Sequence, residues 1–396
     1  MEEWINCPLG EILNFRRGHD LPHTEMAGGD IPVAGSNGII GFHNEASPIS
    51  PCITIGRSGN VGIPFMYNRA WAHNTTLYID DFKGNDPLYI FYLLKTLPLS
   101  SFGGGSAVPT LNRNHIHPLI VKHCTNVSVQ RRIASVLKSF DDKIELNNRI
   151  NHNLEEQAQA LYKSWFVDFE PFKGLDFIDS DLGMIPSSLK IKQISTVKHI
   201  LETGKRPKGG VGDLSFGIPS IGAESIKGLG FFDSSKVKYI SEDFARTLKK
   251  GWIDGYELLI YKDGGKPGYF IPNYNIFGDG FPYDRMCLNE HVFKLDFLDR
   301  GLNAFAYFYF HSEYVFNYLN AQGGKAAIPG INQKDIESLW IFDPNNEHVR
   351  LFSERVSPLI TTILNNCRCN MELAKTRDML LPKLMSGELK INDLTC

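Results

Sequence analysis

One stretch of this 396-residue chain occurs twice, almost half the chain length apart. The segment GGGSAVPTLNRNHI begins at Gly103, and the related segment QGGKAAIPGINQKDI begins at Gln322. In the shared core, Asn112 aligns with Asn332 at an offset of 220 residues. Self-similarity over such a distance indicates a duplicated structural unit, which constrains the fold more than any single motif does.

Further matches extend the repeat toward the N-terminus. IPVAGSNGIIGFHN from Ile31 resembles IPSIGAESIKGLGFFD from Ile218, and TIGRSGNVG from Thr54 resembles LIYKDGGKPG from Leu259. The offset grows along the chain, so the second copy carries extra residues. Because insertions are tolerated in surface loops and not in cores, we predict two similar domains with divergent loops.

Each copy combines short apolar segments broken by glycine with one aromatic helical stretch. The expected strands include IPVAG, CITIG and TLYID in the first copy, and ELLIYKDGG and HVFKLD in the second. The expected helices are PLYIFYLLKTL and NAFAYFYFHSEYVFNYL. This alternation predicts two domains of mixed α/β (α+β) class.

A long amphipathic helix is predicted after each copy. A 4-3 spacing of seam residues runs from Ile133 to Trp165, and the same spacing runs from Phe352 to Leu384. Both runs follow the heptad rule of a coiled coil for more than four heptads. Both also place asparagine at the same two central positions, namely Asn147, Asn151, Asn366 and Asn370.

The two helices can pair along this seam. Antiparallel pairing sets Asn147 opposite Asn370 and Asn151 opposite Asn366, while parallel pairing also places asparagine beside asparagine. We predict the antiparallel coiled coil, because the second domain must join the end of the first helix to the start of the second. Buried asparagines fix the register, since a slip leaves an amide unpaired. A seam of about 33 residues is roughly 50 Å long at ~1.5 Å per residue.

The predicted organisation is therefore domain, helix, domain, helix with an internal pseudo-twofold repeat. Its segments are a first domain over residues 1–126, a first helix over 127–170, a linker over 171–186, a second domain over 187–345, and a second helix with a C-terminal tail over 346–396.

Composition limits the class of protein. With 42% hydrophobic and 21% charged residues, the chain is typical of ordinary globular proteins, and no run approaches the roughly 18 apolar residues of a membrane span. The N-terminus MEEWINCPLG does not resemble a signal peptide, and the seven cysteines form neither a disulfide framework nor a metal motif. We expect a cytoplasmic location.

The net charge of −3 means that contacts to nucleic acid would come from local clusters of basic residues.

With these features in view, the chain resembles the specificity (S) subunits of type I restriction–modification systems. The resemblance rests on GSNGIIGFHNEA, IGRSGNVG, the repeated glycine–proline segment, the first helix from QRRIASVLKSF to KSWF, and the terminal RDMLLPKLMSGEL. It implies two target recognition domains, each reading one half of a bipartite, asymmetric site in double-stranded DNA. It also implies helices that set the spacer and dock two methyltransferase (M) subunits.

The resemblance further implies that catalysis lies with partners. S-adenosylmethionine would belong to the M subunits, which methylate adenine N6, and ATP and Mg would belong to the restriction (R) subunits of this host-defence system. The chain itself should hold no cofactor, because it lacks a glycine-rich nucleotide loop and an aminomethyltransferase motif. Its nearest string, FDPNNE at Phe342, is read as a helix cap formed by Asp343 or Asn345. Two alternatives remain open: a duplicated-domain protein whose target is not DNA, and a self-contained DNA methyltransferase without standard motifs.

Candidate DNA contacts fall at similar places in the two copies. They are basic or polar residues beside glycines, where the backbone can approach a phosphate or a base edge closely. The candidates are Arg16, Arg17, Ser36, Asn37, Arg57, Ser58 and Asn60 in the first copy, and Lys205, Arg206, Lys208, Lys262 and Lys266 in the second.

Other residues are assigned to structure or to partners. Gly103 to Gly105 with Pro109, and Gly323 and Gly324 with Pro329, are expected to shape the junction into each helix. His73, His115 and His117 lack metal-ligand spacing and are interpreted as structural, so no metal site is predicted. The exposed helix faces should hold the M subunits, and the candidates are Arg131, Arg132, Tyr162, Phe166, Arg355 and Lys383.

Overall fold

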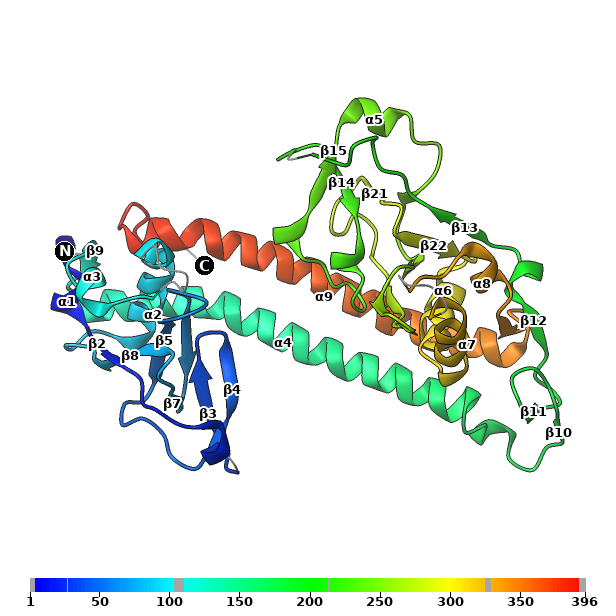
Figure 1. The fold of residues 1–396 in the computed structure, drawn as a ribbon, viewed down its shortest axis with the longest axis horizontal. Helices are drawn as coiled ribbons and strands as arrows, with labels where there is room; N and C mark the ends of the chain where they lie inside the picture. The colour runs from blue at the N-terminus through cyan, green and yellow to red at the C-terminus, as the bar shows by residue number, and fades with distance from the viewer. Residues whose placement is uncertain (1–3, 27, 103–109, 213, 325–328, 392–396) are drawn as a thin grey trace. The chain divides into compact units, whose positions relative to one another are not determined.

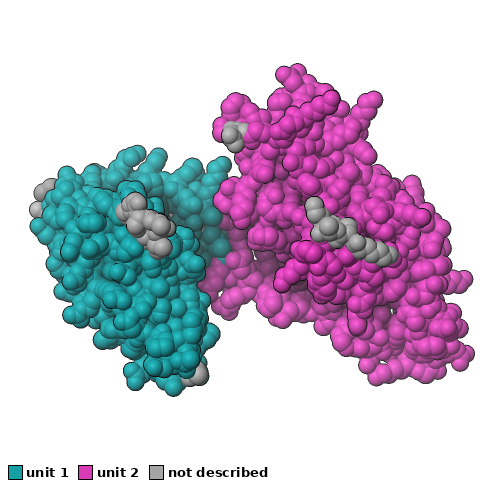
Figure 2. Space-filling model, in the orientation of Figure 1, with its two compact units in different colours: residues 1–144, 372–396 teal, residues 145–371 magenta. Residues whose placement is uncertain are grey.

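The computed structural model describes residues 4–26, 28–102, 110–212, 214–324 and 329–391. The chain forms two compact units, one of residues 1–144 with 372–396 and one of residues 145–371 (Figure 2). Helix α4 (Val127–Phe166) and helix α9 (Glu347–Met385), both labelled in Figure 1, each contribute residues to both units. The two halves of each helix are therefore described with the unit to which they belong.

The first unit is built on a four-stranded antiparallel sheet and a smaller three-stranded sheet. The larger has the order β2 (Asn14–Arg17), β8 (Thr76–Asp81), β5 (Cys52–Gly56), β6 (Pro64–Tyr67). The smaller has the order β4 (Gly38–His43), β3 (Ile31–Gly35), β7 (Trp71–Ala72), in which β3 and β7 run parallel. Remaining elements are the β1–β9 pair (Trp4–Pro8, Ile120–Cys124), α1 (Leu9–Ile12), η1 (His23–Glu25), α2 (Pro87–Thr96), η2 (Leu99–Phe102) and α3 (Arg113–Ile116).

The second unit repeats this topology. Its main sheet has the order β13 (Ile200–Thr203), β22 (Val292–Asp296), β17 (Leu258–Tyr261), β20 (Asn273–Asn275). A second sheet has the order β15 (Lys238–Ile240), β14 (Ile218–Ile221), β21 (Met286–Leu288), β16 (Trp252–Ile253), with β14 and β21 parallel. Remaining elements are the pairs β12–β23 (Ile191–Gln193, Trp340–Phe342), β10–β11 (Phe177–Ile178, Ile185–Pro186) and β18–β19 (Gly265–Lys266, Tyr269–Phe270), helices α5 (Glu242–Arg246), α6 (Arg300–Phe310), α7 (Glu313–Gly323) and α8 (Gln333–Glu337), and η3 (Glu170–Phe172), η4 (Ile194–Thr196), η5 (Ala223–Ser225) and η6 (Ser234–Lys236).

The repeated sequence segment makes the same backbone contacts in both copies. The Leu111 amide donates to the carbonyl of Arg57 at 2.7 Å, and the Ile331 amide donates to the carbonyl of Lys262 at 2.9 Å. The next residues, Asn112 and Asn332, cap α3 and α8 with their side chains. Leu111 is fully buried in one core and Ile331 is buried in the other. The predicted duplication is therefore a duplication of structure. Gly103 to Pro109 lie outside the described residues.

The copies differ where the second is longer. The aromatic stretch predicted as one helix is broken at Ser312, whose hydroxyl accepts from the Val315 amide and starts α7. After β3 the first copy turns back as β4, whereas the segment after β14 begins with η5, and the strand that pairs with β14 comes later as β15. The β18–β19 hairpin lies between β17 and β20, whereas β5 and β6 are joined without one. Insertions of this kind leave the shared sheets intact.

Helices α4 and α9 pair antiparallel within the second unit. The Asn147 amide donates to Asn370 at 2.8 Å, and the Asn366 amide donates to Asn151 at 2.8 Å. Trp165, near the end of α4, contacts Phe352, near the start of α9, with ring centroids 6.4 Å apart. A parallel pairing would have joined Asn147 to Asn366. The predicted antiparallel fold is confirmed.

The part of the seam in the first unit contains one polar layer. Asp141 of α4 forms an ion pair with Arg377 of α9. The Tyr92 hydroxyl of α2 donates to the other Asp141 oxygen at 2.7 Å. Burial alone would raise the pKa of Asp141, but the hydrogen bonds from Tyr92 and Arg377 outweigh it and lower the pKa. This network ties α2 to both long helices.

No helix in the described part of the chain is long and apolar enough to cross a membrane.

Each long helix begins with an asparagine cap: the Asn126 side chain accepts from the Ser128 amide, and the Asn346 side chain accepts from the His348 amide. The prediction that Asp343 or Asn345 caps the second helix is therefore wrong, because the cap is Asn346. The Asp343 side chain instead accepts from the Asn345 amide in the preceding turn.

Candidate nucleic-acid interface

Four arginines line one hollow in the first unit. Arg16 and Arg17 come from the end of β2, Arg57 follows β5, and Arg113 opens α3. The remaining walls are formed by Leu77, Thr110, Leu111 and Asn112. We call this hollow the arginine groove. It unites the predicted DNA contacts Arg16, Arg17 and Arg57 with Arg113, which the sequence analysis did not select.

The local fold explains how these arginines meet. The β2 strand pairs with β8, and β8 pairs with β5, so the ends of β2 and β5 share one edge of the sheet. The repeated segment is held at that edge by the bridge between Ser58 and Thr110. Arg113 donates from its guanidinium to the carbonyl of Phe15 at 3.2 Å. The only signal for Arg113 in the sequence was its place within the repeated segment.

Two carboxylates partly balance the groove. Arg16 lies 3.5 Å from Asp80, and Arg17 lies 3.3 Å from Asp20. The side chains of Arg16 and Arg17 remain 62% and 55% exposed. A side-chain hydrogen bond from Asn74, followed by the charge of Arg17, lowers the pKa of Asp20. Exposed ion pairs of this kind are weak, so both guanidinium groups stay available to an anion in solution.

The polar candidates of the first unit divide by burial. The Ser36 side chain is buried, and its hydroxyl donates to the carbonyl of Thr75 at 2.7 Å. The same carbonyl accepts from the Arg57 amide at 2.8 Å, so Ser36 braces the turn that carries Arg57. Asn37 and Asn60 are exposed, and Ser58 is half-buried.

The second unit arranges its cations differently. Lys205, Arg206 and Lys208 lie in the exposed loop between β13 and β14, where Arg206 pairs with Glu290 at 2.5 Å. Lys262 follows β17 and lies over the ring of Phe293 at 5.4 Å. Lys266 is exposed in the β18–β19 hairpin. The structure therefore distributes the five predicted contacts over three loops.

A cluster of charged side chains lies beneath the main sheet of the second unit, around Lys294. Lys294 in β22 is 3.0 Å from Glu202 and 3.8 Å from Glu257, and it also donates to the carbonyl of Trp252 at 2.7 Å. Burial raises the pKa of Glu257, although backbone amides and Lys294 oppose the shift. Charged groups can remain buried when they are paired and their other hydrogen bonds are satisfied, as those of Lys294, Glu202 and Glu257 are. Glu202 is thereby committed to the interior.

The predicted partner-binding residues on the helices prove to be of two kinds. Arg131 is 71% exposed beside Asp86, Arg132 is exposed, Arg355 stacks on Trp165 at 5.1 Å, and Lys383 lies 4.0 Å from Glu388. The prediction of an exposed position is wrong for Tyr162 and Phe166, which are 2% and 4% exposed. Both rings pack against Phe305 and Phe352, because α6 covers the helix face that the heptad pattern left unassigned.

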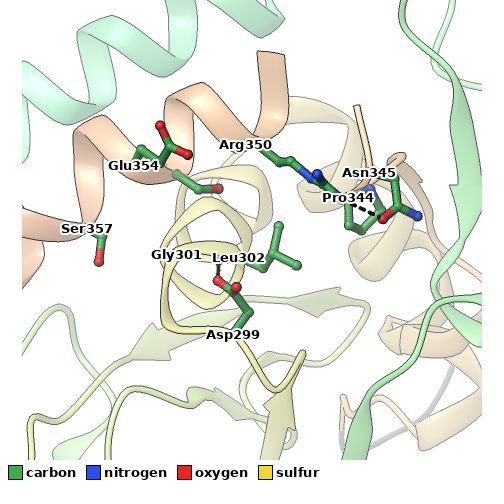
Figure 3. Close-up of a pocket in the computed structure, with 9 residues that line it drawn as sticks. Asp299, Gly301, Leu302, Pro344, Asn345, Arg350, Glu354 and Ser357 are labelled. Atoms are coloured by element: carbon green, nitrogen blue, oxygen red, sulfur yellow. Dashed lines mark hydrogen bonds between the residues drawn. The ribbon is translucent and has the colours of Figure 1, made fainter. Parts of the chain in front are cut away.

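A polar hollow lies between the start of α6 and the first turns of α9 (Figure 3). Asp299 caps α6 by accepting from the Leu302 amide, and Arg350 donates to Asn345 at 3.1 Å. Glu354 and Ser357 extend the hollow along α9. It adjoins the α9 turn that carries Arg355 and so offers a polar surface beside a predicted partner contact.

In the described part of the chain, no group of three or more histidine, cysteine, aspartate or glutamate residues is arranged to hold a metal ion. His73 and His117 make contacts within the fold: His73 Nδ1 lies 3.0 Å from Thr75 Oγ1, and His117 Nε2 accepts from the Phe15 amide at 3.1 Å. Burial lowers the pKa of both imidazoles.

Comparison with known proteins gives concordant results. Residues 1–156 match the family described as the type I restriction modification DNA specificity domain. The chain is 28% identical over 318 residues to the type I restriction enzyme MjaIX specificity subunit of Methanocaldococcus jannaschii, covering 77% of this chain and 70% of that protein. It is 26% identical over 315 residues to the HindI specificity subunit of Haemophilus influenzae, covering 66% and 67%.

The fold has a solved counterpart. The crystal structure of a type I restriction–modification S subunit from M. genitalium superposes with a TM-score of 0.61, at 15% sequence identity, over 97% of this chain and 96% of that one. Its likeness concerns the fold alone.

The duplicated α/β domain with paired long helices is the fold of that solved structure. By sequence, the chain is similar to proteins of type I restriction–modification systems. Within that class its sequence is similar to the specificity (S) subunits, and residues 1–156 match their DNA specificity domain. A specificity subunit is a non-catalytic part of the restriction–modification enzyme.

Proposed function

We propose that the chain selects a bipartite DNA site, with each mixed α/β domain reading one half-site. The observation that carries this proposal is the repeat itself: each copy holds a basic residue, Arg57 or Lys262, directly after a strand of the same sheet and against the same repeated segment. Cations bind phosphates and fix the register on DNA, while polar side chains that reach base edges supply specificity.

The residues proposed to contact DNA follow from exposure. In the first domain these are Arg16, Arg17 and Arg57 with the exposed amides of Asn37 and Asn60, and Ser58 lies half-buried beside them. Ser36 supports Arg57 from within, although its oxygen can still accept a hydrogen bond. In the second domain the proposed contacts are Lys205, Arg206, Lys208, Lys262 and Lys266.

The long helices are proposed to set the spacing between half-sites and to dock two M subunits. The hydrogen-bonded pairs Asn147–Asn370 and Asn151–Asn366 hold the register, so a heptad added to one helix alone would misalign the amides. Arg131, Arg132, Arg355 and Lys383 remain the docking candidates, because they are charged residues on the helices and not in the core. S-adenosylmethionine would be supplied by the M subunits, and ATP with Mg by R subunits.

The test is to map modified adenines after expressing the chain with its M subunit in a host without DNA methylation. We expect one split, asymmetric motif with a fixed gap. Replacing residues 1–126 with the corresponding domain of another S subunit should change one half of the motif only. A soluble, associated complex that modifies no site, or a domain exchange that changes both halves, would contradict the proposal.

A further inference from the structure

The two domains carry different charges at equivalent places. Arg17 lies opposite Leu77 in β8, and Thr203 lies opposite Phe293 in β22, with a closely packed glycine following each. Arg16 and Arg17 therefore correspond to Glu202 and Thr203. This correspondence comes from the strand pairing, since the sequence places the second cationic cluster after Gly204 instead of before it.

The other two arginines can be matched in the same way. Arg57 corresponds to Lys262, because their carbonyls accept from Leu111 and Ile331 in the repeated segment. Arg113 follows the cap residue Asn112, and Gln333 follows the cap residue Asn332. The Gln333 side chain donates to Glu337 at 2.8 Å, so it is engaged within α8.

The positive charge is smaller at the second place than at the first. The arginine groove combines four guanidinium groups with the carboxylates of Asp20 and Asp80. Its counterpart retains one of these four cations, Lys262, with Glu202 and the neighbouring Asp263; Glu202 pairs with the buried Lys294, and Asp263 lies 2.6 Å from His291. An anion at the second place would therefore meet fewer cations at the strand ends, because Lys205, Arg206 and Lys208 lie in the loop beyond Gly204.

We propose that the arginine groove is a binding site for DNA backbone phosphates, to which Arg113 contributes as Arg57 does, and that the matching place of the second domain has no equivalent groove. The inference rests on the proposed DNA-reading function. Guanidinium groups bind phosphate oxygens in bidentate geometry, and an open groove admits a backbone that passes along the surface. Each phosphate contact releases counterions and adds about 0.9 to the slope of log K against log salt.

The experiment measures binding of a fluorescent duplex to the full-length chain, co-purified with its M subunit, between about 50 and 200 mM salt. Arg57→Gln and Arg113→Gln are each expected to reduce the slope by about 1, and the double variant by about 2. Arg149→Gln removes the same charge from an exposed position on α4, and Gln333→Ala alters the matched position of the second domain. Both controls should keep the wild-type slope.

The two arginine variants differ in how much they should affect folding. Arg113 donates to the Phe15 carbonyl, so its variant loses one internal hydrogen bond, whereas the Arg57 contacts described above use its backbone. Arg57→Gln therefore tests the groove even where Arg113→Gln lowers the melting temperature. Because phosphate contacts carry no sequence information, the methylated motif should be unchanged in both variants.

The outcomes separate the two proposals. Salt-dependent binding by the wild type, with the Arg57 and Arg113 variants matching the Arg149 control, would overturn the groove assignment and leave the DNA-reading function standing. A changed motif in either variant would show base readout and would also overturn it. Absence of salt-dependent binding by the wild type would count against both.

Discussion

The polar layer at Asp141 allows a quantitative test of how the first unit is held together. Asp141→Asn keeps the shape of the side chain and an acceptor for Tyr92, but it removes the charge that faces Arg377. The two side chains are 29% and 20% exposed, so the loss is intermediate between that of a surface pair and that of a buried pair. We expect a loss of about 1–2 kcal/mol in the free energy of unfolding at pH 7.

The pH dependence gives the sign of the effect. The pKa of Asp141 is lowered in the folded state, so its contribution is present above the unfolded-state pKa of about 3.9 and is lost as pH falls through the folded-state pKa. The wild type and Asp141→Asn should therefore differ at pH 7, and the difference should shrink as the pH falls below the unfolded-state pKa. Urea unfolding followed by helical circular dichroism measures both values.

The neighbouring carboxylate supplies a matched control. Asp142 pairs with Lys138 on the exposed face of α4, where both side chains are about half exposed. Asp142→Asn should cost less than about 0.5 kcal/mol at pH 7. Equal losses for Asp141→Asn and Asp142→Asn, or an Asp141→Asn difference that stays constant down to pH 3, would refute the reasoning.

Three further predictions concern the seam, the sheet edge and the reading surface. A double-mutant cycle of Asn147→Ala and Asn370→Ala should give a coupling energy of about 0.5–1.5 kcal/mol by urea unfolding, and additive losses would argue against the hydrogen bond between them. Gly18→Ala should unfold the first unit or lower its melting temperature strongly, because the new Cβ would lie 2.1 Å from the His73 carbonyl oxygen; a wild-type melting curve would contradict this packing. Ser36→Ala should lower stability by about 1 kcal/mol, whereas Asn37→Ala should leave stability unchanged and weaken binding of cognate duplex, and the reverse pattern in paired melting and binding assays would exchange the roles assigned to them.

The sequence by itself determined the repeat, the fold class and the antiparallel pairing of the long helices. Hydrophobic periodicity and the aligned asparagines are local, one-dimensional signals that identify the two matching seams. Asn147 and Asn370 are 223 positions apart. Their pairing was predictable because each lies at a defined place in its own heptad and because the intervening domain must join the end of the first helix to the start of the second.

Only the tertiary structure decided which side chains share a surface. Arg113 joins Arg16, Arg17 and Arg57 because strand pairing and one backbone bridge bring separate segments to the same edge, and no periodicity encodes that meeting. The structure likewise buried Tyr162 and Phe166, which the heptad pattern left open to a partner. A helix pattern identifies its apolar stripe, but whether a neighbouring domain covers a second face depends on contacts distant in sequence.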